Sequence, residues 1–199
     1  MFIPNIVLVR HGQTTWSLSG KHTGRTDVEL DSFGIDQAKK VGKVLQGISF
    51  QRVLSSPLSR ALDTCFLAGF EPSSVEINND LVEWDYGDYE GKTTLEIQQE
   101  RPSWNVWEQG VINGETLDQI AQRVDRVISS LKSDKGPHII FAHGHLLRIL
   151  AARWMSLEPS VGGKLQLSPA SISVLSSEHG IAGISKWNQQ SHLEDNIFG

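Results

Sequence analysis

Apolar positions follow two different periods along the chain. Short, mostly apolar runs typical of buried strands cover residues 6–9, 53–56, 75–77 and 137–142. Apolar residues at helical spacing cover residues 34–45 and 117–131, and a more uniformly apolar helix is predicted over residues 146–154. Strands that alternate with helices in this order predict an α/β fold built on parallel strands.

The end of the chain follows a different pattern. Residues 171–175 and 181–187 are typical of two strands around the turn Glu178-His179-Gly180, which predicts a hairpin. We therefore expect a three-layer α/β/α sandwich with a mostly parallel central sheet and a C-terminal hairpin at one edge. The length and the absence of a linker predict that residues 1–199 form a single domain.

Two of the predicted strands end in a histidine followed by glycine. Arg10-His11-Gly12 comes directly after the first strand, and His143-Gly144-His145 comes directly after the fourth. A parallel sheet would bring these two strand ends to the same edge, where open α/β folds bind ligands. A fixed cation beside a nitrogen nucleophile suits a substrate that carries phosphate. Taken alone, the first motif could instead be a strand-end arginine with an exposed histidine.

Further candidates lie between the two motifs. Pro57 is well placed as the first residue of a helix, which puts Arg60 in the first turn, near backbone N–H groups that attract anions. In isolation, Arg60 could instead lie on a solvated helix face. A carboxyl group among the aromatic residues of the stretch 81–91 can hold a proton near neutral pH. The candidates there are Glu83, Asp85, Asp88 and Glu90, and residue chemistry alone does not choose among them.

Taken together, these motifs resemble the histidine phosphatase superfamily, in its phosphoglycerate mutase-like branch. The resemblance extends from Ile6 to about Leu193. It implies catalytic roles for the two histidines, for the two arginines and for one acid; the residues are His11, His143, Arg10, Arg60 and Glu83. It also implies phosphate contacts, which fall on Gln13, Thr14, Thr23 and Gly24.

A narrower resemblance is to the fungal sedoheptulose-1,7-bisphosphatases and similar bacterial sugar phosphatases. Residues 16–20, 23–27, 83–91 and 113–116 carry it. In that group, the arginine that matches Arg148 reaches the substrate. The chain has Ser17 where mutases typically carry asparagine, and His22 where the subgroup has another aromatic residue before Thr-Gly. The resemblance completes the predicted substrate-binding set with Ser17, His22, Tyr86, Gly144 and Arg148.

These residue types permit phosphoryl transfer through a covalent intermediate. His11 can attack phosphorus, while Arg10 and Arg60 hold the phosphoryl oxygens and His143 supplies a further donor. Glu83 would protonate the leaving oxygen and later activate water. We expect no cofactor and no metal. A metal site built from His143 and His145 with His11, Asp85 or Asp88 is the rival interpretation, but neighbouring guanidinium groups would repel a divalent cation.

Residues 92–114 are expected to form a short cap over the site. Trp104, Val106 and Trp107 are apolar enough to close a pocket, although a plain core role is equally open for either tryptophan. Mutases of the family carry a longer insertion between Glu83 and His143. A shorter cap admits water more readily, which favours hydrolysis over return of the phosphoryl group.

The charge balance and the cysteine content limit which kinds of partner and which cell compartment are expected. The chain has 23 acidic and 18 basic residues, so nucleic acid and anionic membranes are not expected as partners. Cys65 is the single cysteine, which fits a reducing compartment, and no signal peptide is expected before the first strand. We therefore expect a cytoplasmic protein with a small phosphorylated substrate, and a homo-oligomer remains possible. The sequence assigns no role to His138, His145, His179 and His192.

Three functions compete at this point. The first is a phosphatase for a small phosphorylated metabolite, above all a sugar bisphosphate such as sedoheptulose 1,7-bisphosphate. The second is a phosphoglycerate mutase. The third is a non-catalytic phospho-ligand binder, which the complete set of reactive residues disfavours.

Overall fold

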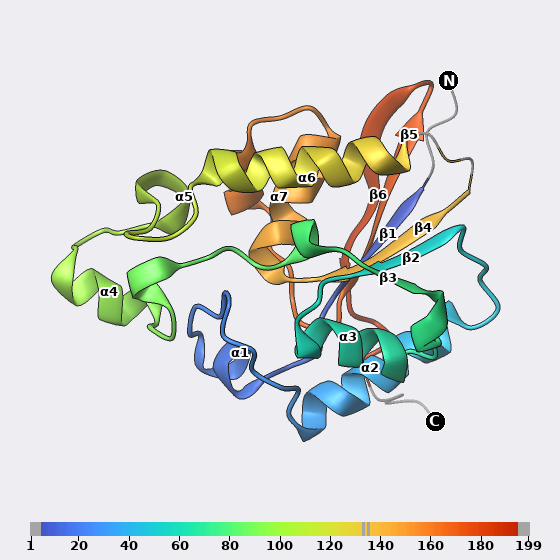
Figure 1. The fold of residues 1–199 in the computed structure, drawn as a ribbon, viewed down its shortest axis with the longest axis horizontal. Coiled ribbons are helices and arrows are strands. Elements are labelled where there is room, and N and C mark those ends of the chain that lie inside the picture. Colours follow the sequence, from blue (N-terminus) through green and yellow to red (C-terminus); the bar gives the residue numbers. More distant parts are fainter. Residues whose placement is uncertain (1–4, 133, 135, 195–199) are drawn as a thin grey trace.

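The computed structural model describes residues 5–132, 134 and 136–194. Its strands are β1 (Ile6–Arg10), β2 (Arg52–Ser55), β3 (Val75–Ile77), β4 (His138–Ala142), β5 (Ile172–Glu178) and β6 (Ile181–Gln189). They form one six-stranded sheet in the order β3-β2-β4-β1-β5-β6 (Figure 1). β1 to β4 are paired in parallel, whereas β5 is antiparallel to β1 and to β6. The predicted mostly parallel sheet with a C-terminal hairpin is confirmed.

Helices cover both faces of this sheet. They are α1 (Thr15–Ser19), α2 (Ser32–Leu45), α3 (Ser59–Leu67), α4 (Thr94–Glu100), α5 (Val106–Gln109), α6 (Leu117–Leu131) and α7 (Gly144–Trp154). Short 3₁₀ helices cover Pro72–Ser74, Asn79–Leu81, Gly87–Tyr89 and Pro159–Lys164. In Figure 1, α6 and α7 lie above the strands, and α2 and α3 lie below them. The predicted three-layer sandwich is therefore confirmed.

The period-2 pattern of the strands explains why the sheet has two cores. Along β4, Ile140 and Ala142 pack with α6 and α7, while Ile139 and Phe141 pack with α2 and α3. Successive side chains of a strand point to opposite faces, so a central strand covered by helices on both sides must be apolar throughout. All five residues of β4 are buried.

The start of α3 differs by two residues from the prediction. Pro57 does not begin the helix; α3 begins at Ser59, after Leu58 in extended conformation. The Ser59 backbone N–H and hydroxyl both donate to Asp27 Oδ1, at 2.9 and 2.8 Å. This distant carboxylate caps the helix, because the segment before Ser59 has no side-chain cap of its own. Arg60 nevertheless lies in the first turn, as predicted.

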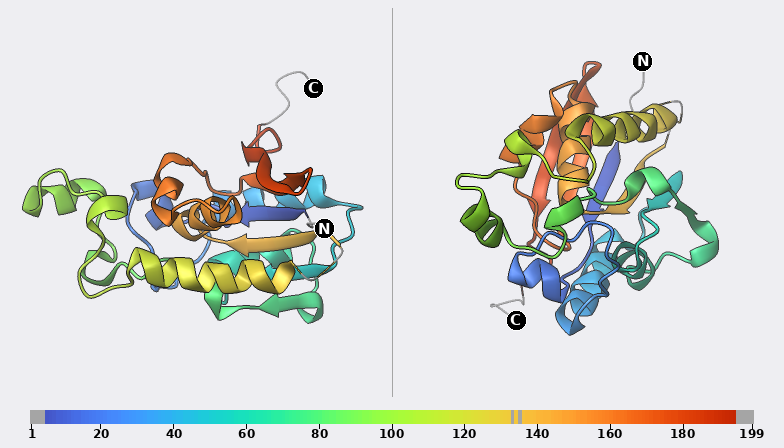
Figure 2. Two further views of the ribbon diagram at one scale, coloured as in Figure 1. Left: turned by 90° about the horizontal axis from the view of Figure 1, so that it is seen from above. Right: turned by 60° about the vertical axis from the view of Figure 1, so that its left-hand side comes forward.

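The cap segment extends to one side of the sheet. α4 and α5 project at the left of Figure 1, and the left view of Figure 2 shows them beyond the end of the strands. Thr93 and Glu96 form a capping box that begins α4. Within the cap segment, the side chains of Ile97 and Trp104 are buried. The predicted helical or irregular cap is thus two short helices joined by a turn.

The hairpin turn is formed by His179 and Gly180, with φ angles of 51° and 82°. Positive φ at both central residues matches the twist of the flanking strands. In the described part of the chain, no helix is both long and apolar enough to cross a membrane. The single-domain prediction for residues 1–199 remains a prediction, and its ends (1–4 and 195–199) lie outside the described residues.

Candidate active site

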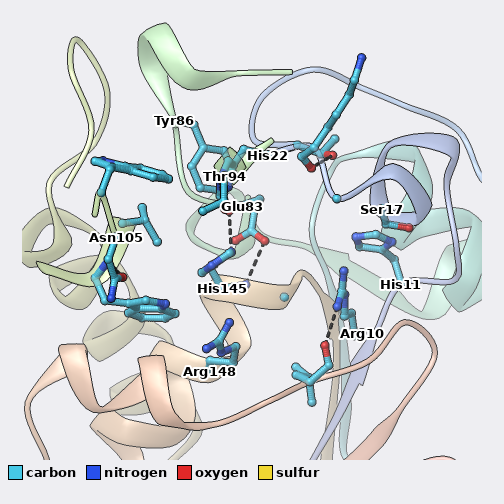
Figure 3. Close-up of a pocket in the computed structure, with 18 of the residues that line it drawn as sticks. Arg10, His11, Ser17, His22, Glu83, Tyr86, Thr94, Asn105, His145 and Arg148 are labelled. Carbon is cyan, nitrogen blue, oxygen red and sulfur yellow. Dashed lines mark hydrogen bonds between the residues drawn. The ribbon is translucent and has the colours of Figure 1, made fainter. Parts of the chain in front are cut away.

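A cavity of about 510 Å³ lies where β1 and β4 end, beneath α4 and α5. That volume is within the range of small-molecule sites. Figure 3 shows Arg10 and His11 on one side of it, Tyr86, Asn105, His145 and Arg148 on the other, and Glu83 between them. The other lining residues are Ser17, Gly20, Lys21, His22, Thr23, Thr94, Gln98, Trp104, Val106, Trp107, Gly144 and Leu167.

The register of the sheet brings the two histidine motifs together. Arg10 pairs with Ala142 in the parallel ladder, so His11 and His143 each follow at the same level. Their ring centroids are 5.3 Å apart. Both side chains are buried, with 4% and 0% of their surface exposed. The expected meeting of the two strand ends is therefore observed, while the roles of the two histidines stay predictions.

The ring of His11 is held in the form that a nucleophile needs. Its Nδ1 is 2.7 Å from the carbonyl oxygen of Gly12. A carbonyl only accepts, so the proton lies on Nδ1. Burial lowers the pKa of His11 well below 6.5, and the charges of Arg60 and Arg10 lower it further. Nε2 therefore carries a free lone pair at neutral pH.

Arg10 provides the fixed positive charge beside His11. Its Nη1 donates to the Leu167 carbonyl at 2.5 Å, whereas its buried Nε has no partner among the described residues. A Cβ placed on Gly144 would lie 3.3 Å from both Nε and Cζ of Arg10. Glycine at position 144 thus leaves room for the guanidinium group. A buried N–H without a partner at the edge of a cavity is a ready donor for an anion.

Arg60 and His143 are both buried next to His11. Neither is among the described residues that line the cavity. Arg60 Nε donates to His143 Nδ1 at 3.2 Å. Because Nδ1 accepts, His143 donates through Nε2 to the Ser56 hydroxyl, 2.7 Å away. Burial and the charge of Arg60 both lower the pKa of His143 well below 6.5.

The guanidinium of Arg60 also holds the loop of residues 23–26, which begins at the cavity-lining residue Thr23. Nη1 donates to the Thr26 carbonyl and Nη2 to the Gly24 carbonyl, each at 2.9 Å. A Cβ on Gly24 would lie 2.3 Å from the Trp84 carbonyl oxygen, so this close approach requires glycine. In this structure, Arg60 therefore holds His143 and the 23–26 loop in place.

Glu83 stands out among the acids of the 81–91 stretch. It is 4% exposed and lines the cavity, which none of the described residues Asp85, Asp88 and Glu90 does. Its Oε2 accepts the His145 backbone N–H at 3.0 Å, and Oε1 accepts that of Leu146 at 2.9 Å. The carboxylate thus sits at the N-terminus of α7, where unpaired N–H groups attract negative charge.

The far wall of the cavity is aromatic and carries a second cation. Arg148 lies 4.6 Å from the Trp107 ring centre. Its Nε and Nη2 donate to the carbonyls of Gly162 and Gly163, each at 2.9 Å. His22 packs on Tyr86 and Trp104, and burial lowers its pKa to about 4. Trp104, Val106 and Trp107 line the cavity, and all three also pack in or against the core, so both interpretations of the tryptophans hold in part.

Three residues predicted to contact phosphate have other partners in the structure. Gln13 donates through Nε2 to Asp31, the cap of α2. The Thr14 hydroxyl accepts the Ser17 N–H and caps α1. The Gly24 N–H donates to Glu90 Oε1 at 2.8 Å. These contacts shape the loops around the site, and phosphate contacts at these positions stay predictions. Of the other predicted substrate-binding residues, Ser17, His22, Thr23, Tyr86, Gly144 and Arg148 line the cavity.

Several lining residues were not predicted. His145 was left without a role, although its place two residues after His143 gave a usable signal. Asn105 and Leu167 gave none, because their position depends on how distant segments fold over the sheet. The other three unassigned histidines lie elsewhere: His138 is buried at the start of β4, His179 is in the hairpin turn, and His192 bonds to the Ala170 carbonyl. Cys65 is buried within α3, and burial raises the pKa of its thiol to about 12.

The rival metal site has no geometric support in the part of the chain that the structure describes. No group of three or more histidine, cysteine, aspartate or glutamate side chains is placed to hold a metal ion there. His143 faces Ser56 and Arg60, whereas His145 faces Tyr86. The two histidines of the His-Gly-His motif therefore point into different surroundings.

Known proteins share this architecture and sequence. An acid phosphatase of Mycobacterium tuberculosis is 38% identical over 180 residues, covering 88% of each chain. The sedoheptulose 1,7-bisphosphatase of Saccharomyces cerevisiae is 37% identical, covering 77% of this chain and 68% of that protein. A solved structure of a Mycobacterium tuberculosis open reading frame has a TM-score of 0.88 at 35% identity, covering 94% of this chain and 98% of that one.

Other relatives differ in their named activity. A metal-independent phosphoserine phosphatase of Arabidopsis thaliana is 32% identical over 96% of this chain, and a phosphoglycerate mutase of Cytophaga hutchinsonii is 31% identical over 79%. The model of the histidine phosphatase superfamily (branch 1) matches residues 6–190. Because this model covers most of the chain and relatives above 30% identity match it, the chain belongs to the histidine phosphatase superfamily, as a phosphatase or mutase acting on small phosphorylated substrates.

Proposed function

We propose that this protein is a phosphatase that hydrolyses a sugar bisphosphate, such as sedoheptulose 1,7-bisphosphate, through a phosphohistidine intermediate. The carrying observation is that Arg10 and Arg148, two of the three cationic residues that line the cavity in the described part of the chain (Lys21 is the third), stand apart from each other. Arg10 stands beside His11, and Arg148 stands on the opposite wall (Figure 3). A substrate with a phosphate at each end can meet both. The sedoheptulose 1,7-bisphosphatase relative supports the same substrate class.

The first step uses the lone pair on His11 Nε2. It attacks phosphorus, the bond from phosphorus to the sugar oxygen breaks, and Glu83 gives that oxygen a proton. Arg10 supports this step because its unpartnered Nε–H can bind a phosphoryl oxygen as charge spreads over the group. The His143 ring packs beside that of His11, and Arg60 holds His143 in place. Burial together with the charges of Arg60 and Arg10 keeps the ring of His11 neutral.

The second step returns the enzyme to its starting state. Glu83, now ionised, takes a proton from water, and the resulting nucleophile attacks the phosphohistidine. Inorganic phosphate leaves and His11 regains its lone pair. Glu83 can serve both steps because the backbone N–H groups of His145 and Leu146 hold its carboxylate in one position. No step in this scheme uses a metal.

Phosphoglycerate mutase is the second candidate. It is favoured by the relatives with that name, and it would use the same phosphohistidine. The two activities differ in what accepts the phosphoryl group: water in one case, a second phosphoglycerate in the other.

A substrate panel separates these functions. Phosphate release from sedoheptulose 1,7-bisphosphate, other sugar phosphates and phosphoserine is measured beside interconversion of 2- and 3-phosphoglycerate, each with and without excess chelator. We expect the highest kcat/KM on a sugar bisphosphate, with the same rate in chelator. Faster phosphoglycerate interconversion would assign the mutase activity instead. Loss of activity in chelator, with recovery on adding magnesium or zinc, would contradict the arginine-based mechanism.

A further inference from the structure

The imidazole of His145 is a polar group in the cavity that the scheme above does not use. His145 is the second residue of α7, and its half-buried side chain lines the cavity. Its ring lies 5.1 Å from that of Trp107 and 5.7 Å from that of Tyr86. Two aromatic neighbours therefore fix the plane of the ring. The backbone N–H of the same residue binds Glu83, which places this ring next to the acid.

One nitrogen of the ring is taken by Tyr86. The Tyr86 hydroxyl is 2.7 Å from His145 Nδ1. Burial raises the pKa of Tyr86 well above 10, so the hydroxyl keeps its proton. No other hydrogen bond from this buried hydroxyl is found among the described residues. We assign the hydroxyl as the donor to Nδ1, because this direction gives its proton a partner within the protein.

That bond decides where His145 carries its own proton. Burial lowers the pKa of His145 well below 6.5, and the charge of Arg148 lowers it further, so the ring is neutral. A neutral imidazole has one N–H. Since Nδ1 accepts from Tyr86, the proton lies on Nε2. Nε2 has no partner among the described residues, and it is the nitrogen left to face a ligand.

We infer that His145 donates a hydrogen bond from Nε2 to a hydroxyl group of the alcohol that leaves, and that Tyr86 is the positioning residue that holds this tautomer. The inference rests on the proposed function and deepens it by naming the ligand chemistry. His145 gives the enzyme a preference for phosphate esters of polyhydroxylated alcohols. The same wall supports this chemistry, because Thr94, Gln98 and Asn105 also line it with neutral polar groups.

The neutrality of the ring matters for this role. A charged imidazole would attract the phosphoryl group and compete with Arg10 for it. A neutral N–H instead binds a hydroxyl, which rewards a sugar over a plain alkyl group. A site built to bond a hydroxyl also rejects the analogue that lacks it, because its own polar group is then left unpaired.

The test uses two small esters that differ only in hydroxyl groups. Glycerol 2-phosphate and isopropyl phosphate share the branched leaving carbon, and both need a proton on the leaving oxygen. We expect the wild-type enzyme to prefer glycerol 2-phosphate in kcat/KM. His145→Ala should lower that preference about tenfold, the upper range for one neutral hydrogen bond. Tyr86→Phe should lower it about threefold, because the ring can then exchange tautomers.

Two further measurements keep the result specific. Nitrogen NMR of wild-type enzyme should show His145 protonated on Nε2 alone, and Tyr86→Phe should show a mixture. His179→Ala, in the exposed hairpin turn, is the matched histidine control and should leave the preference unchanged.

The outcomes separate the two levels of the proposal. No release of phosphate from the sugar bisphosphate by wild-type enzyme would overturn the proposed function together with this inference. Release from the sugar bisphosphate without any preference for glycerol 2-phosphate over isopropyl phosphate would overturn the inference alone. Release from both, with an unchanged preference in His145→Ala and Tyr86→Phe, would overturn the inference alone. If His145→Ala does not fold, the Tyr86→Phe preference and its tautomer spectrum decide.

Discussion

The two ends of the cavity are built from different kinds of structure. At the phosphoryl end, Arg10 and His11 follow a buried strand that is paired in register with β4. At the leaving-group end, Asn105 and Trp107 come from the α4–α5 cap, and Arg148 from the side of α7. The first end is held by a ladder of backbone hydrogen bonds, the second by aromatic packing. Residues on a strand end are fixed to a narrow geometry, whereas those on a cap can change with its packing.

The nucleophile is the sharpest way to test the phosphoryl end. His11→Ala removes the lone pair that attacks the substrate phosphorus, so turnover should fall by about 10⁶-fold, as on removal of other enzymic nucleophiles. Acid-labile labelling by phosphorylated substrate should vanish as well. Wild-type-like rates in this variant would rule out the covalent mechanism. Binding of vanadate to the folded variant is the control for an intact cavity.

Glu83 lies between the two ends, and its replacement should affect substrates unequally. Glu83→Gln keeps the size but cannot donate an acidic proton, so kcat/KM should fall roughly 10²–10⁴-fold with a sugar phosphate. The loss should be much smaller with p-nitrophenyl phosphate, whose leaving group is already stable. Arg60→Ala should instead reduce both alike, because Arg60 supports the common phosphoryl end through His143.

Equal losses for the two substrates in Glu83→Gln would exclude Glu83 as the general acid, with Asp85 and Asp88 as the next candidates. Because the carboxylate also caps α7, thermal unfolding of this variant is recorded as the control. A lower melting temperature without substrate dependence would indicate a structural effect alone.

The buried histidines of the phosphoryl end predict a loss of stability in acid. The pKa values of His11 and His143 lie well below 6.5 in the folded protein because of burial and the charge of Arg60. Below about pH 6.5 the unfolded chain takes up protons that the folded chain does not. The contribution of each buried neutral histidine to the free energy of unfolding is therefore complete above that pH. It is lost as the pH falls below it, by about 1.4 kcal/mol per pH unit for each histidine.

Urea unfolding at pH 7.5 and pH 5.5 measures this effect. His143→Asn should reduce the dependence of the unfolding free energy on pH, while the exposed control His179→Asn should leave it unchanged. A dependence that is the same in all three proteins would show that other groups titrate.

At the leaving-group end, Trp107 should have the smallest effect. Trp107→Leu removes the ring on which Arg148 lies, and KM for a sugar bisphosphate should rise about tenfold. The rise should be smaller for p-nitrophenyl phosphate, which lacks the second phosphate. Trp187→Leu, in β6, is the matched tryptophan control. An equal rise of KM for both substrates would contradict the assignment of Arg148 to a second phosphate.

The same contrast explains what the sequence could predict. The strands, the hairpin and the meeting of His11 with His143 follow from local patterns, because register in a parallel sheet is decided by the apolar periods of adjacent strands. Residue chemistry alone left Glu83 and Asp85 open, and the family resemblance pointed to Glu83. That the Glu83 carboxylate binds the N-terminus of α7 could be seen only in the folded structure. Asn105 and Leu167 could not be predicted, because their partners are far away in the chain.

The difference over Pro57 has the same origin. A local rule placed the start of the helix there, but Asp27, a residue from another loop, supplied the cap two positions later. His145 is a second example. Its motif could be seen in the sequence, but its tautomer depends on the hydroxyl of Tyr86, a residue far away in the chain. Local sequence motifs identify which residues can react, whereas contacts between distant segments decide how those residues are capped, hydrogen-bonded and protonated.

The cap has one more property, which concerns the residues at which the cavity can be altered by substitution. Thr94, Gln98 and residues 104–107 come from one uninterrupted stretch of chain, while the reacting histidines belong to strands outside it. Ile97, Trp104 and Val106 of this stretch pack in the same core as β1 and β4, whereas Thr94, Gln98 and Asn105 are not part of that core. The polar wall of the cavity can therefore be redesigned at Thr94, Gln98 and Asn105, within 14 consecutive residues (94–107), while the backbone pairing of β1 with β4 stays as it is.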